Sequence, residues 1–101
     1  MAERFMSANS WWVYIVRCAD GSLYTGIARD LDKRIAAHNG AGSAGASYTR
    51  ARRPVRLVYR EGADNRSLAS RREYEIKQLS REDKLALVLS AAAAGKGGDQ
   101  Q

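Results

Sequence analysis

The sequence predicts an α+β fold whose elements follow the order strand, strand, helix, strand, helix, helix. The first observation is a pair of apolar, aromatic runs within Trp11–Gly26 that flank Asp20-Gly21, a dipeptide typical of hairpin turns. The second is the partly alternating run Val55–Tyr59, which follows Pro54 and predicts a third strand. The third is a set of three segments with helix caps and helical periodicity. No internal repeat or linker divides the chain, so we expect one domain.

Whether Tyr14 and Tyr24 share one face of the hairpin depends on the length of its loop. A two-residue loop would place the two phenols on opposite faces, because a slip of one residue turns every side chain to the other face. A three-residue loop, Ala19–Gly21, would pair Tyr14 with Gly26 and bring both phenols to one face. Such a loop usually ends in a left-handed residue, and Gly21 stands at that position. We therefore expect the three-residue loop.

The first helix is expected to begin after Asp30, a good N-cap, and to stop near Asn39. Its apolar residues form a stripe one turn long, and Arg34 and His38 lie directly beside that stripe. We therefore expect both side chains to lean toward the sheet. The small residues 40–47 predict a long loop, of a kind that is often functional.

Two more helices are expected after the third strand. The first covers residues 66–80 and is capped by Asp64 or Asn65. A helical wheel places four of its apolar side chains on one side: Leu68, Ala69, Ile76 and Leu79. The second covers residues 81–89 behind the cap Ser80, with acidic residues in its first turn, where the helix dipole favours them.

Composition limits the size and class of the protein. The chain has 101 residues, 45% of them hydrophobic, which suits one domain with a modest core. We expect that domain at residues 11–89 and disorder at residues 1–10 and 90–101, which have little to bury. The sequence lacks both an apolar run of the ~20 residues that span a membrane and a secretory signal, so we expect a cytoplasmic monomer without membrane contact. The single cysteine, Cys18, excludes an internal disulfide and is expected in the core.

The charge of the chain indicates the class of its partner. Seventeen basic and eleven acidic residues give a net charge of +6, which favours binding to polyanions such as DNA. Five arginines lie in residues 47–60 with no acid among them: Arg50, Arg52, Arg53, Arg56 and Arg60. We expect the first four to bind nucleic acid, since a forked guanidinium suits phosphate. The alternative is a solvated face that only keeps the protein soluble.

Several familiar catalytic sites are absent from the sequence. It has no glycine-rich phosphate loop with its lysine, and one histidine is too few for a histidine-rich metal site or a persuasive catalytic triad. What remains is tyrosines, arginines, one histidine and carboxylates on a basic protein, a set that suits phosphodiester hydrolysis. That reaction needs a base for the attacking water, a cation to offset charge on the phosphate, and help for the leaving oxygen.

An ordered set of motifs resembles the GIY-YIG nuclease superfamily, in particular its small stand-alone bacterial members. The set is Val13-Tyr14-Ile15, then Tyr24-Thr25-Gly26, then Arg34 and His38 four residues apart, and then a glutamate on the next long helix. The match covers residues 11 to about 88. It implies a three-stranded antiparallel sheet flanked by helices. It also implies divalent-metal-dependent cleavage of DNA, which we expect to be endonucleolytic and linked to repair or processing.

The resemblance also implies roles for single residues. Four of them would form the catalytic group: Tyr14, Tyr24, Arg34 and His38. Either tyrosine would remove the proton of the attacking water, with the histidine as a relay, while the arginine would steady the phosphate. Gly26 would leave room at the site. Glu73 would bind Mg²⁺ or Mn²⁺, which would stabilise the departing 3′ oxygen.

Some features depart from the family pattern or leave alternatives open. The first motif lacks its glycine, and Ile27 stands where some nuclease members carry a lysine near the attacking water, which could mean weak activity. A free tyrosine has a pKa near 10, so a tyrosine base needs a neighbouring cation, and Arg34 is the expected source. The helical wheel does not choose between Glu73 and Glu75; only the resemblance does.

Plainer alternatives exist for each assignment. The tyrosines could be packing residues, and the arginine and histidine could be an ordinary solvated helix edge. Trp11 and Trp12 are expected to be core and edge anchors, with stacking on exposed bases as the alternative. For the whole protein, the alternative is a non-catalytic nucleic-acid-binding module on the same fold. If the protein is a nuclease, its DNA substrate is expected to be branched, nicked or single-stranded.

Overall fold

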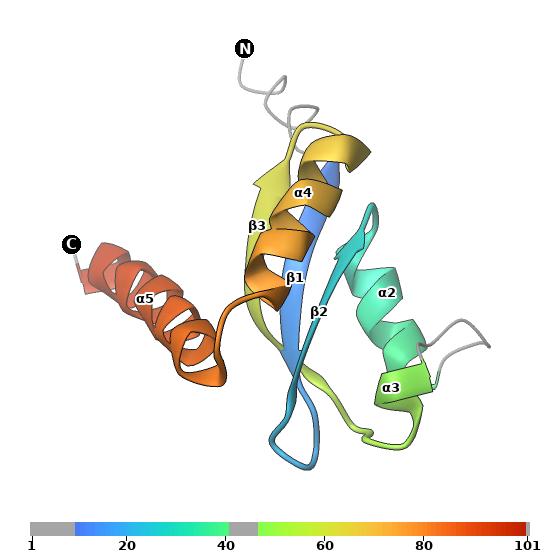
Figure 1. Cartoon of the computed structure of the whole chain (residues 1–101). Helices are drawn as coiled ribbons and strands as arrows, with labels where there is room; N and C mark the ends of the chain where they lie inside the picture. Colours follow the sequence, from blue (N-terminus) through green and yellow to red (C-terminus); the bar gives the residue numbers. More distant parts are fainter. Residues whose placement is uncertain (1–9, 41–46, 101) are drawn as a thin grey trace.

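A three-stranded antiparallel sheet in the order β2-β1-β3 lies at the centre of the computed structural model, which describes residues 10–40 and 47–100 (Figure 1). β1 (Trp11–Arg17) is the central strand, between β2 (Leu23–Ala28) and β3 (Arg56–Ala63). The helices of the described residues are α2 (Leu31–His38), α3 (Ser47–Arg50), α4 (Arg66–Lys77) and α5 (Arg81–Gln100). The α+β class and the antiparallel sheet flanked by helices are confirmed.

The hairpin of β1 and β2 has the three-residue loop expected from its sequence. Tyr14 lies opposite Gly26, and Val16 lies opposite Tyr24, so the two tyrosines start from the same face of the sheet. Gly21 has a φ of 86°, the left-handed conformation that glycine adopts without strain. The turn chemistry therefore sets the register that brings both phenols to one face.

β3 begins and ends later than the predicted strand of residues 55–59. Its start is displaced because the side chain of Asn39 binds the backbone of Val55. The Val55 N–H donates to Asn39 Oδ1 (2.7 Å), and Asn39 Nδ2 donates to the Val55 carbonyl (3.0 Å). At its other end β3 pairs with β1 as far as Ala63, opposite Trp11. Residues 60–63 are polar or small and break the apolar alternation, so the sequence gives no strand signal there.

The helix starts follow the capping residues of the sequence. The Asp30 carboxylate accepts a hydrogen bond from the Lys33 N–H (3.1 Å) and caps α2. The Asn65 side chain accepts one from the Leu68 N–H (2.9 Å) and caps α4, so the cap is Asn65 and not Asp64. Local side-chain chemistry thus accounts for both boundaries.

Two helical segments differ from the sequence prediction. The one-turn helix α3 was not expected; most of the predicted loop that precedes it, residues 41–46, lies outside the described residues. α5 continues to Gln100, where the sequence predicts disorder from residue 90. The four alanines at 91–94 account for the first part of this extension, since alanine has the highest helix propensity and needs no apolar partner. Residues 95–100 include three glycines, and their sequence does not explain why the helix continues. The predicted disorder at residues 1–9 also lies outside the described part of the chain.

The sheet buries an apolar cluster on each of its faces. The cluster on the face of Tyr14 contains five further buried residues: Val16, Cys18, Ala28, Leu31 and Val55. The other cluster joins Val13 and Ile15 of β1 to Ala69 and Ile76 of α4. Cys18 is thus a core residue, as expected.

The prediction that Leu68 lies on the buried side of α4 is wrong, because this side chain is 45% exposed. The buried residues of α4 are Ala69 and Ile76, which stand seven positions apart and define a narrow stripe. Leu68 precedes Ala69 by one residue, which turns it about 100° around the helix and away from that stripe.

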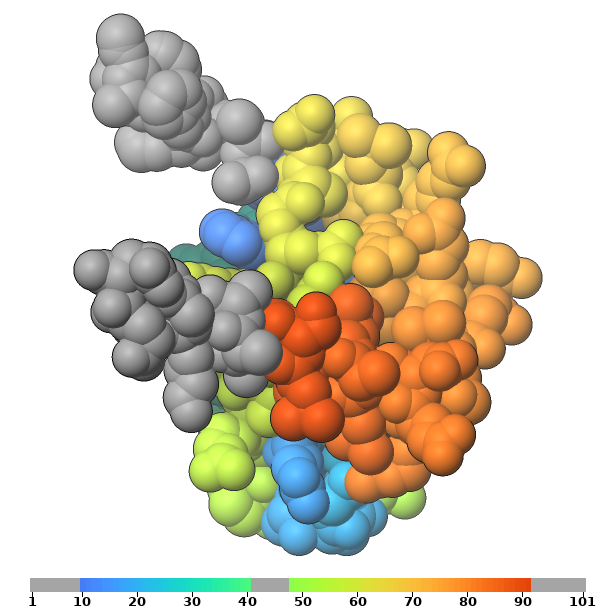
Figure 2. All heavy atoms as spheres, turned by 90° about the vertical axis from the view of Figure 1, so that its left-hand side faces the viewer, coloured from blue at the N-terminus to red at the C-terminus, as the bar shows by residue number. Residues whose placement is uncertain are grey.

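α5 packs against β3 and the hairpin. In Figure 2 the start of α5, coloured orange-red, lies between β3 in yellow-green and the hairpin in blue. Arg81 Nη2 donates a hydrogen bond to the Gly21 carbonyl (3.0 Å), which ties the start of this helix to the hairpin turn. Within the described ranges, no helix combines the length and the apolar character needed to cross a membrane.

Candidate active site

Tyr14 lies at the centre of the candidate site and is completely buried. Its ring passes over the backbone of Gly26, the residue opposite it on β2. A Cβ added at Gly26 would lie only 2.6 Å from the Tyr14 hydroxyl oxygen and 2.7 Å from Cζ, so any side chain would displace the ring. The glycine of the Tyr24-Thr25-Gly26 motif is therefore required by the packing of Tyr14, which is the crowding expected from the sequence.

His38 connects Tyr14 to α3. Its Nε2 lies 2.7 Å from the Tyr14 hydroxyl, and its Nδ1 lies 2.7 Å from the Thr49 hydroxyl. All three residues are completely buried, so both ring nitrogens bond to protein groups and not to water. In one tautomer the tyrosine donates to Nε2 while Nδ1–H donates to Thr49; in the other tautomer both donor directions are reversed. The chain of bonds suits transfer of a proton to or from Tyr14.

The imidazole of His38 is neutral at pH 7. Burial lowers its pKa to about 4, and the positive charges of Arg34 and Arg53 act in the same direction. The Arg53 Nε–H also donates a hydrogen bond to the His38 carbonyl (2.6 Å). A neutral ring with one acceptor nitrogen is able to receive a proton from a neighbouring hydroxyl.

Tyr24 is the more exposed of the two motif tyrosines. Its side chain is only partly buried, and its ring contacts the edge of the His38 ring at a centroid distance of 5.3 Å. On its other side it stacks on Tyr48 of α3, with centroids 5.7 Å apart. Tyr14, Tyr24 and His38 therefore form one aromatic group, as the three-residue hairpin loop predicts.

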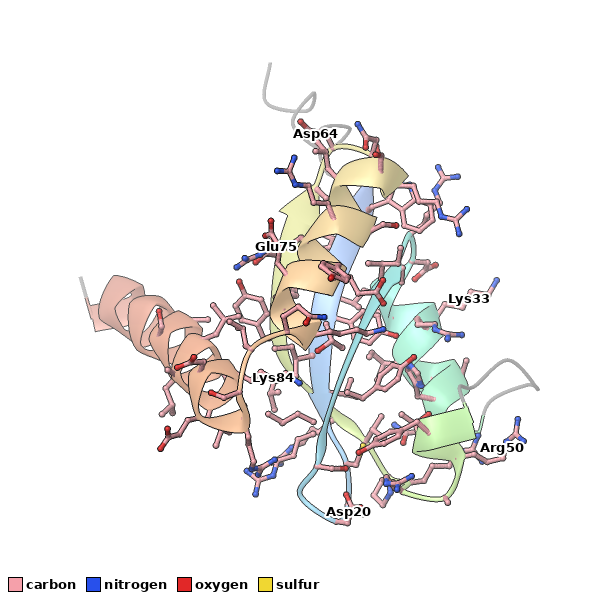
Figure 3. All side chains as sticks on the ribbon, in the orientation of Figure 1. Asp20, Lys33, Arg50, Asp64, Glu75 and Lys84 are labelled. Carbon is pink, nitrogen blue, oxygen red and sulfur yellow. The ribbon has the colours of Figure 1, made fainter. Side chains whose placement is uncertain are left out.

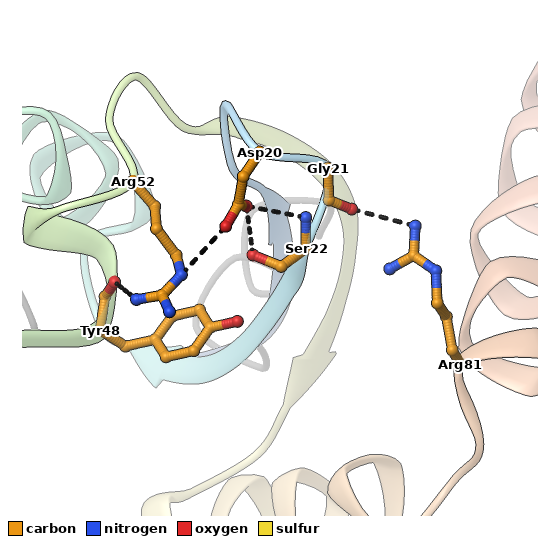
Figure 4. A network of polar contacts seen from close by, with 6 residues as sticks. All are labelled: Asp20, Gly21, Ser22, Tyr48, Arg52 and Arg81. Carbon is orange, nitrogen blue, oxygen red and sulfur yellow. Dashed lines mark hydrogen bonds and ion pairs between the residues drawn. The ribbon is translucent and has the colours of Figure 1, made fainter.

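The segment that carries Tyr48 is tied to the hairpin turn by a polar network (Figure 4). Arg52 Nε donates to the Asp20 carboxylate (3.1 Å), Arg52 Nη1 donates to the Tyr48 carbonyl (2.9 Å), and its guanidinium lies 4.0 Å from the Tyr48 ring centroid. Asp20 also accepts hydrogen bonds from the Ser22 hydroxyl and N–H, which are the first causes of its lowered pKa. The network fixes Tyr48 beside Tyr24.

Arg34 and Glu73 are placed near Tyr14 by their effects on its phenol. Burial raises the pKa of Tyr14, and a hydrogen bond and the charge of Arg34 oppose that rise. The negative charge of Glu73 adds to the rise in pKa. The expected influence of Arg34 on a tyrosine is thus present, but at Tyr14 desolvation outweighs it.

The structure distinguishes the two candidate glutamates of α4. The Glu73 side chain is 23% exposed, and its carboxylate lies 3.2 Å from Lys77 Nζ. Glu75 is 49% exposed and pairs with Arg71 and Arg72 on the β3 side of the helix (Figure 3). The negative charge of Glu73 contributes to the raised pKa of Tyr14, whereas the carboxylate of Glu75 is paired with two arginines, so Glu73 is the candidate for the site.

A second network sets the rotation of α4. Arg72 Nε donates to one oxygen of Glu61 (2.9 Å), and the Tyr59 hydroxyl donates to the other (2.5 Å). Glu61 and Tyr59 both belong to β3, so the side chain of Arg72 is directed toward that strand. Successive helical residues differ by about 100°, and Glu73 is therefore directed away from β3.

The arginines predicted to bind nucleic acid fall into two groups. Arg50 and Arg56 are exposed, and Figure 3 shows Arg50 projecting outward from the region of α3. Arg52 and Arg53 are only partly buried, but each bonds within the protein, to Asp20 and to the His38 carbonyl. Arg56 also lines a cavity of about 320 Å³ with Arg17 at the end of β1. Of the four arginines, Arg52 and Arg53 therefore have a clear structural role.

The donor set suits a magnesium or manganese ion. Among the described residues there is no group of three or more histidines, cysteines or carboxylates that would hold a metal by themselves. Mg²⁺ in nucleotide-processing sites commonly takes one or two carboxylates, keeps several waters and completes its shell with substrate phosphate oxygens. Glu73, a partly shielded carboxylate whose charge contributes to the raised pKa of Tyr14, fits that pattern.

Several residues of the site were missed by sequence reasoning. Tyr48 and Thr49 lie on a helix of four residues, too short to give a periodic signal. Lys77 lies four residues after Glu73, a spacing typical of helical ion pairs. This spacing could have predicted the contact between the two side chains from the sequence. Nothing in the local sequence connects Arg53 with the His38 carbonyl, because that contact depends on the tertiary fold.

Comparison with known proteins gives consistent results. Residues 10–86 match the family model described as GIY-YIG catalytic domain. UPF0213 protein DP2720 of Desulfotalea psychrophila is 60% identical over 79 residues, which are 78% of this chain and 71% of that protein. UPF0213 protein SSP2268 of Staphylococcus saprophyticus is 57% identical over 77 residues, 76% of this chain and 92% of the relative. The solution NMR structure of UPF0213 protein BH0048 from Bacillus halodurans is similar, with a TM-score of 0.50, 42% identity, and coverage of 77% of this chain and 81% of that one.

Proposed function

This chain belongs to the GIY-YIG family, and from that premise we propose that it is a divalent-metal-dependent nuclease that hydrolyses phosphodiester bonds in DNA. One observation carries the proposal: the side chains named from the sequence motifs meet around a single buried tyrosine. His38 bonds to the Tyr14 hydroxyl, the Tyr24 ring contacts His38, and the charges of Arg34 and Glu73 act on Tyr14. Such convergence of a basic group, phenols and one carboxylate suits phosphodiester hydrolysis.

In the proposed reaction Tyr24 contacts the attacking water. Tyr14 is less suited to that contact, because it is completely buried and its pKa is raised. Tyr24 is partly exposed and lies between His38 and Tyr48, which hold the orientation of its ring. As the phenolate it would take the proton of the water and become the neutral phenol, while Arg34 binds a phosphate oxygen.

His38 and Tyr14 form the interior part of the proposed site. The neutral imidazole holds the Tyr14 hydroxyl at 2.7 Å and supports the Tyr24 ring. A phosphate bound beside Arg34 would offset part of the positive charge that lowers the His38 pKa. The ring would then become a better proton acceptor when substrate is present than when it is absent.

Glu73 would hold Mg²⁺ or Mn²⁺ together with the scissile phosphate. When bound, the ion would neutralise charge on the phosphate and stabilise the departing 3′ oxygen. Lys77 Nζ lies 3.2 Å from one oxygen of this carboxylate and pairs with it. The proposal extends to endonucleolytic cleavage of branched, nicked or single-stranded DNA by a cytoplasmic monomer in repair or processing.

The decisive experiment compares two neighbouring glutamates. The Glu73→Gln variant and its control Glu75→Gln make the same chemical change on the same helix, but Glu75 pairs with Arg71 and Arg72, whereas the charge of Glu73 contributes to the raised pKa of Tyr14. We expect Mg²⁺-dependent nicking of single-stranded, nicked, flap and junction substrates by the wild type and by Glu75→Gln. Glu73→Gln should lose at least ~100-fold in cleavage rate, as for loss of an essential electrostatic group, and should still bind DNA. Equal residual cleavage by both variants would indicate a contaminating nuclease.

The second candidate is a non-catalytic nucleic-acid-binding module. The observation that favours it is the desolvated Tyr14 phenol, whose raised pKa makes it a poor base. This candidate predicts DNA binding without metal-dependent cleavage of any substrate in the panel. The same experiment therefore separates the two functions.

A further inference from the structure

A basic and aromatic surface surrounds the end of the sheet where β1 begins. Trp11 and Trp12 are the first two residues of that strand, and both side chains are partly buried. Because they are consecutive in a strand, they point to opposite faces of the sheet. Three exposed arginines stand against the two indole rings: Arg29, Arg60 and Arg66. We call these five residues the tryptophan end of the sheet.

One half of this surface adjoins the candidate active site. The Arg60 guanidinium lies 5.3 Å from the ring centroid of Trp12. Arg60 is directly opposite Tyr14 in the β1–β3 register, and Trp12 precedes Tyr14 by two residues. Alternation along the strands therefore puts all three side chains on one face of the sheet. The surface therefore begins directly beside Tyr14, at the residue opposite it on β3.

The other half is built around Trp11. The guanidiniums of Arg29 and Arg66 lie 5.9 Å and 5.8 Å from its ring centroid. Arg29 follows the last residue of β2, and Arg66 is the first residue of α4, so three separate segments converge on one indole. From Tyr14 to Trp11 the strand runs about 10 Å, which at ~3.4 Å per nucleotide is the length of about three nucleotides.

The three guanidiniums have no acidic partner among the described residues. The acids next to them in sequence bond elsewhere: Asp30 accepts from the Lys33 N–H, and Glu61 pairs with Arg72. Asp64 lies in the turn before α4 (Figure 3), and no ion pair joins it to the three guanidiniums. Each guanidinium lies within cation–π distance of an indole ring, a contact that does not use its N–H donors. These arginines are therefore held in place with donors still available for phosphate oxygens.

We propose that the tryptophan end of the sheet binds the phosphate backbone of a nucleic-acid strand on one side of the bond to be cleaved. This surface differs from the one predicted at residues 50–56, where Arg52 and Arg53 bond within the protein. The inference rests on the proposed nuclease function and names a substrate contact for it. The binding itself requires neither a metal ion nor cleavage of the strand. Arginine contacts with phosphate, and contact of exposed bases with the indole rings, are the chemistry of strand binding.

Intrinsic fluorescence tests the proposal, because the chain has two tryptophans and both belong to this surface. The Glu73→Gln variant is titrated in EDTA with single-stranded and duplex oligonucleotides, and tryptophan emission is followed beside the anisotropy of a label on the oligonucleotide. We expect both signals to change with the same dissociation constant. Arg60→Gln and Arg66→Gln should each reduce the slope of log K against log salt by about 0.7 for a single strand.

Arg71→Gln is the matched control. Arg71 is an exposed arginine of α4, as Arg66 is, but it pairs with Glu75 and not with a tryptophan. Its substitution should leave the slope unchanged, and circular dichroism should show that all variants are folded. Binding seen by anisotropy without a change in emission, equal losses in Arg71→Gln and Arg60→Gln, or no binding at all would each overturn the proposal. Binding here by a protein that cleaves nothing would support this surface while refuting the nuclease function.

Discussion

His38 makes the stability of this protein sensitive to mild acid. In the unfolded chain its imidazole titrates near the ordinary pKa of 6.5, whereas in the folded protein its pKa is about 4. Between those values the unfolded chain binds a proton that the folded protein does not, so the free energy of unfolding falls as the pH decreases. From pH 7 to pH 5 we expect a loss of about 2 kcal/mol. Urea unfolding at pH 5, 6 and 7 measures it.

The control for this prediction is the His38→Gln variant. It removes the titrating ring and keeps a polar side chain, so its overall stability will be lower but its dependence on pH between 7 and 5 should be much weaker. Most carboxylates stay ionised over this range, so they contribute little to the difference. A wild-type protein that is equally stable at pH 5 and pH 7 would contradict the buried, neutral state of His38.

At the scale of residues, the sequence predicted the aromatic part of the site and missed its supports. Gly21 determines the loop, the loop determines the register, and the register brings Tyr14 and Tyr24 to one face. Each step is local, so each is readable from the sequence. Thr49 meets His38 only because two segments that are distant along the chain are brought together in the fold. Such a contact leaves no trace in periodicity or turn chemistry.

At the scale of elements, α4 divides its charged residues between two neighbours. Arg72 bonds to Glu61 on β3, while Glu73 and Lys77, four residues apart, pair with each other away from that strand. The ammonium of Lys77 occupies the carboxylate proposed to bind metal. A metal ion must therefore displace it.

Removal of that ammonium should favour metal binding. A helical ion pair of this kind contributes about 0.3–0.5 kcal/mol, so Lys77→Met should lower the Mn²⁺ concentration for half-saturation by about twofold. Electron paramagnetic resonance of free Mn²⁺, with an oligonucleotide present, measures binding without relying on activity. Lys33→Met, an exposed lysine of α2, is the control. Weaker Mn²⁺ binding by Lys77→Met would instead indicate that the lysine helps to hold the phosphate.

The elements also differ in how far the sequence could predict them. Caps defined the starts of α2 and α4, because Asp30 and Asn65 bond to backbone groups three residues away. The start of β3 depends on Asn39, a residue of another segment, and its end depends on pairing with β1. Boundaries set by local hydrogen bonds were predictable, whereas those set by tertiary contacts were not.

At the scale of the whole molecule, positive charge is distributed around the candidate site and is not confined to one segment. The net charge of +6 favours any polyanion, but under the proposed function the arrangement of single arginines would decide which part of a strand lies near Tyr24. Arg34 lies at the proposed reacting phosphate, and the three arginines of the tryptophan end lie beyond it. In the proposed nuclease, substrate capture and chemistry would therefore depend on different groups.

This separation predicts that salt affects capture and not the chemical step. With about four phosphate contacts to a single strand, log K should change with log salt at a slope near −3. Raising NaCl from about 50 to about 200 mM should then lower kcat/KM by on the order of 50-fold and leave kcat nearly constant, because saturating substrate no longer reports capture. Steady-state kinetics at constant Mg²⁺ measure both parameters. The Arg66→Gln variant should show a shallower slope in kcat/KM, since it has lost one contact. A fall in kcat with kcat/KM unchanged would mean that the arginines act at the reacting phosphate itself, and the division between capture and chemistry would then be wrong.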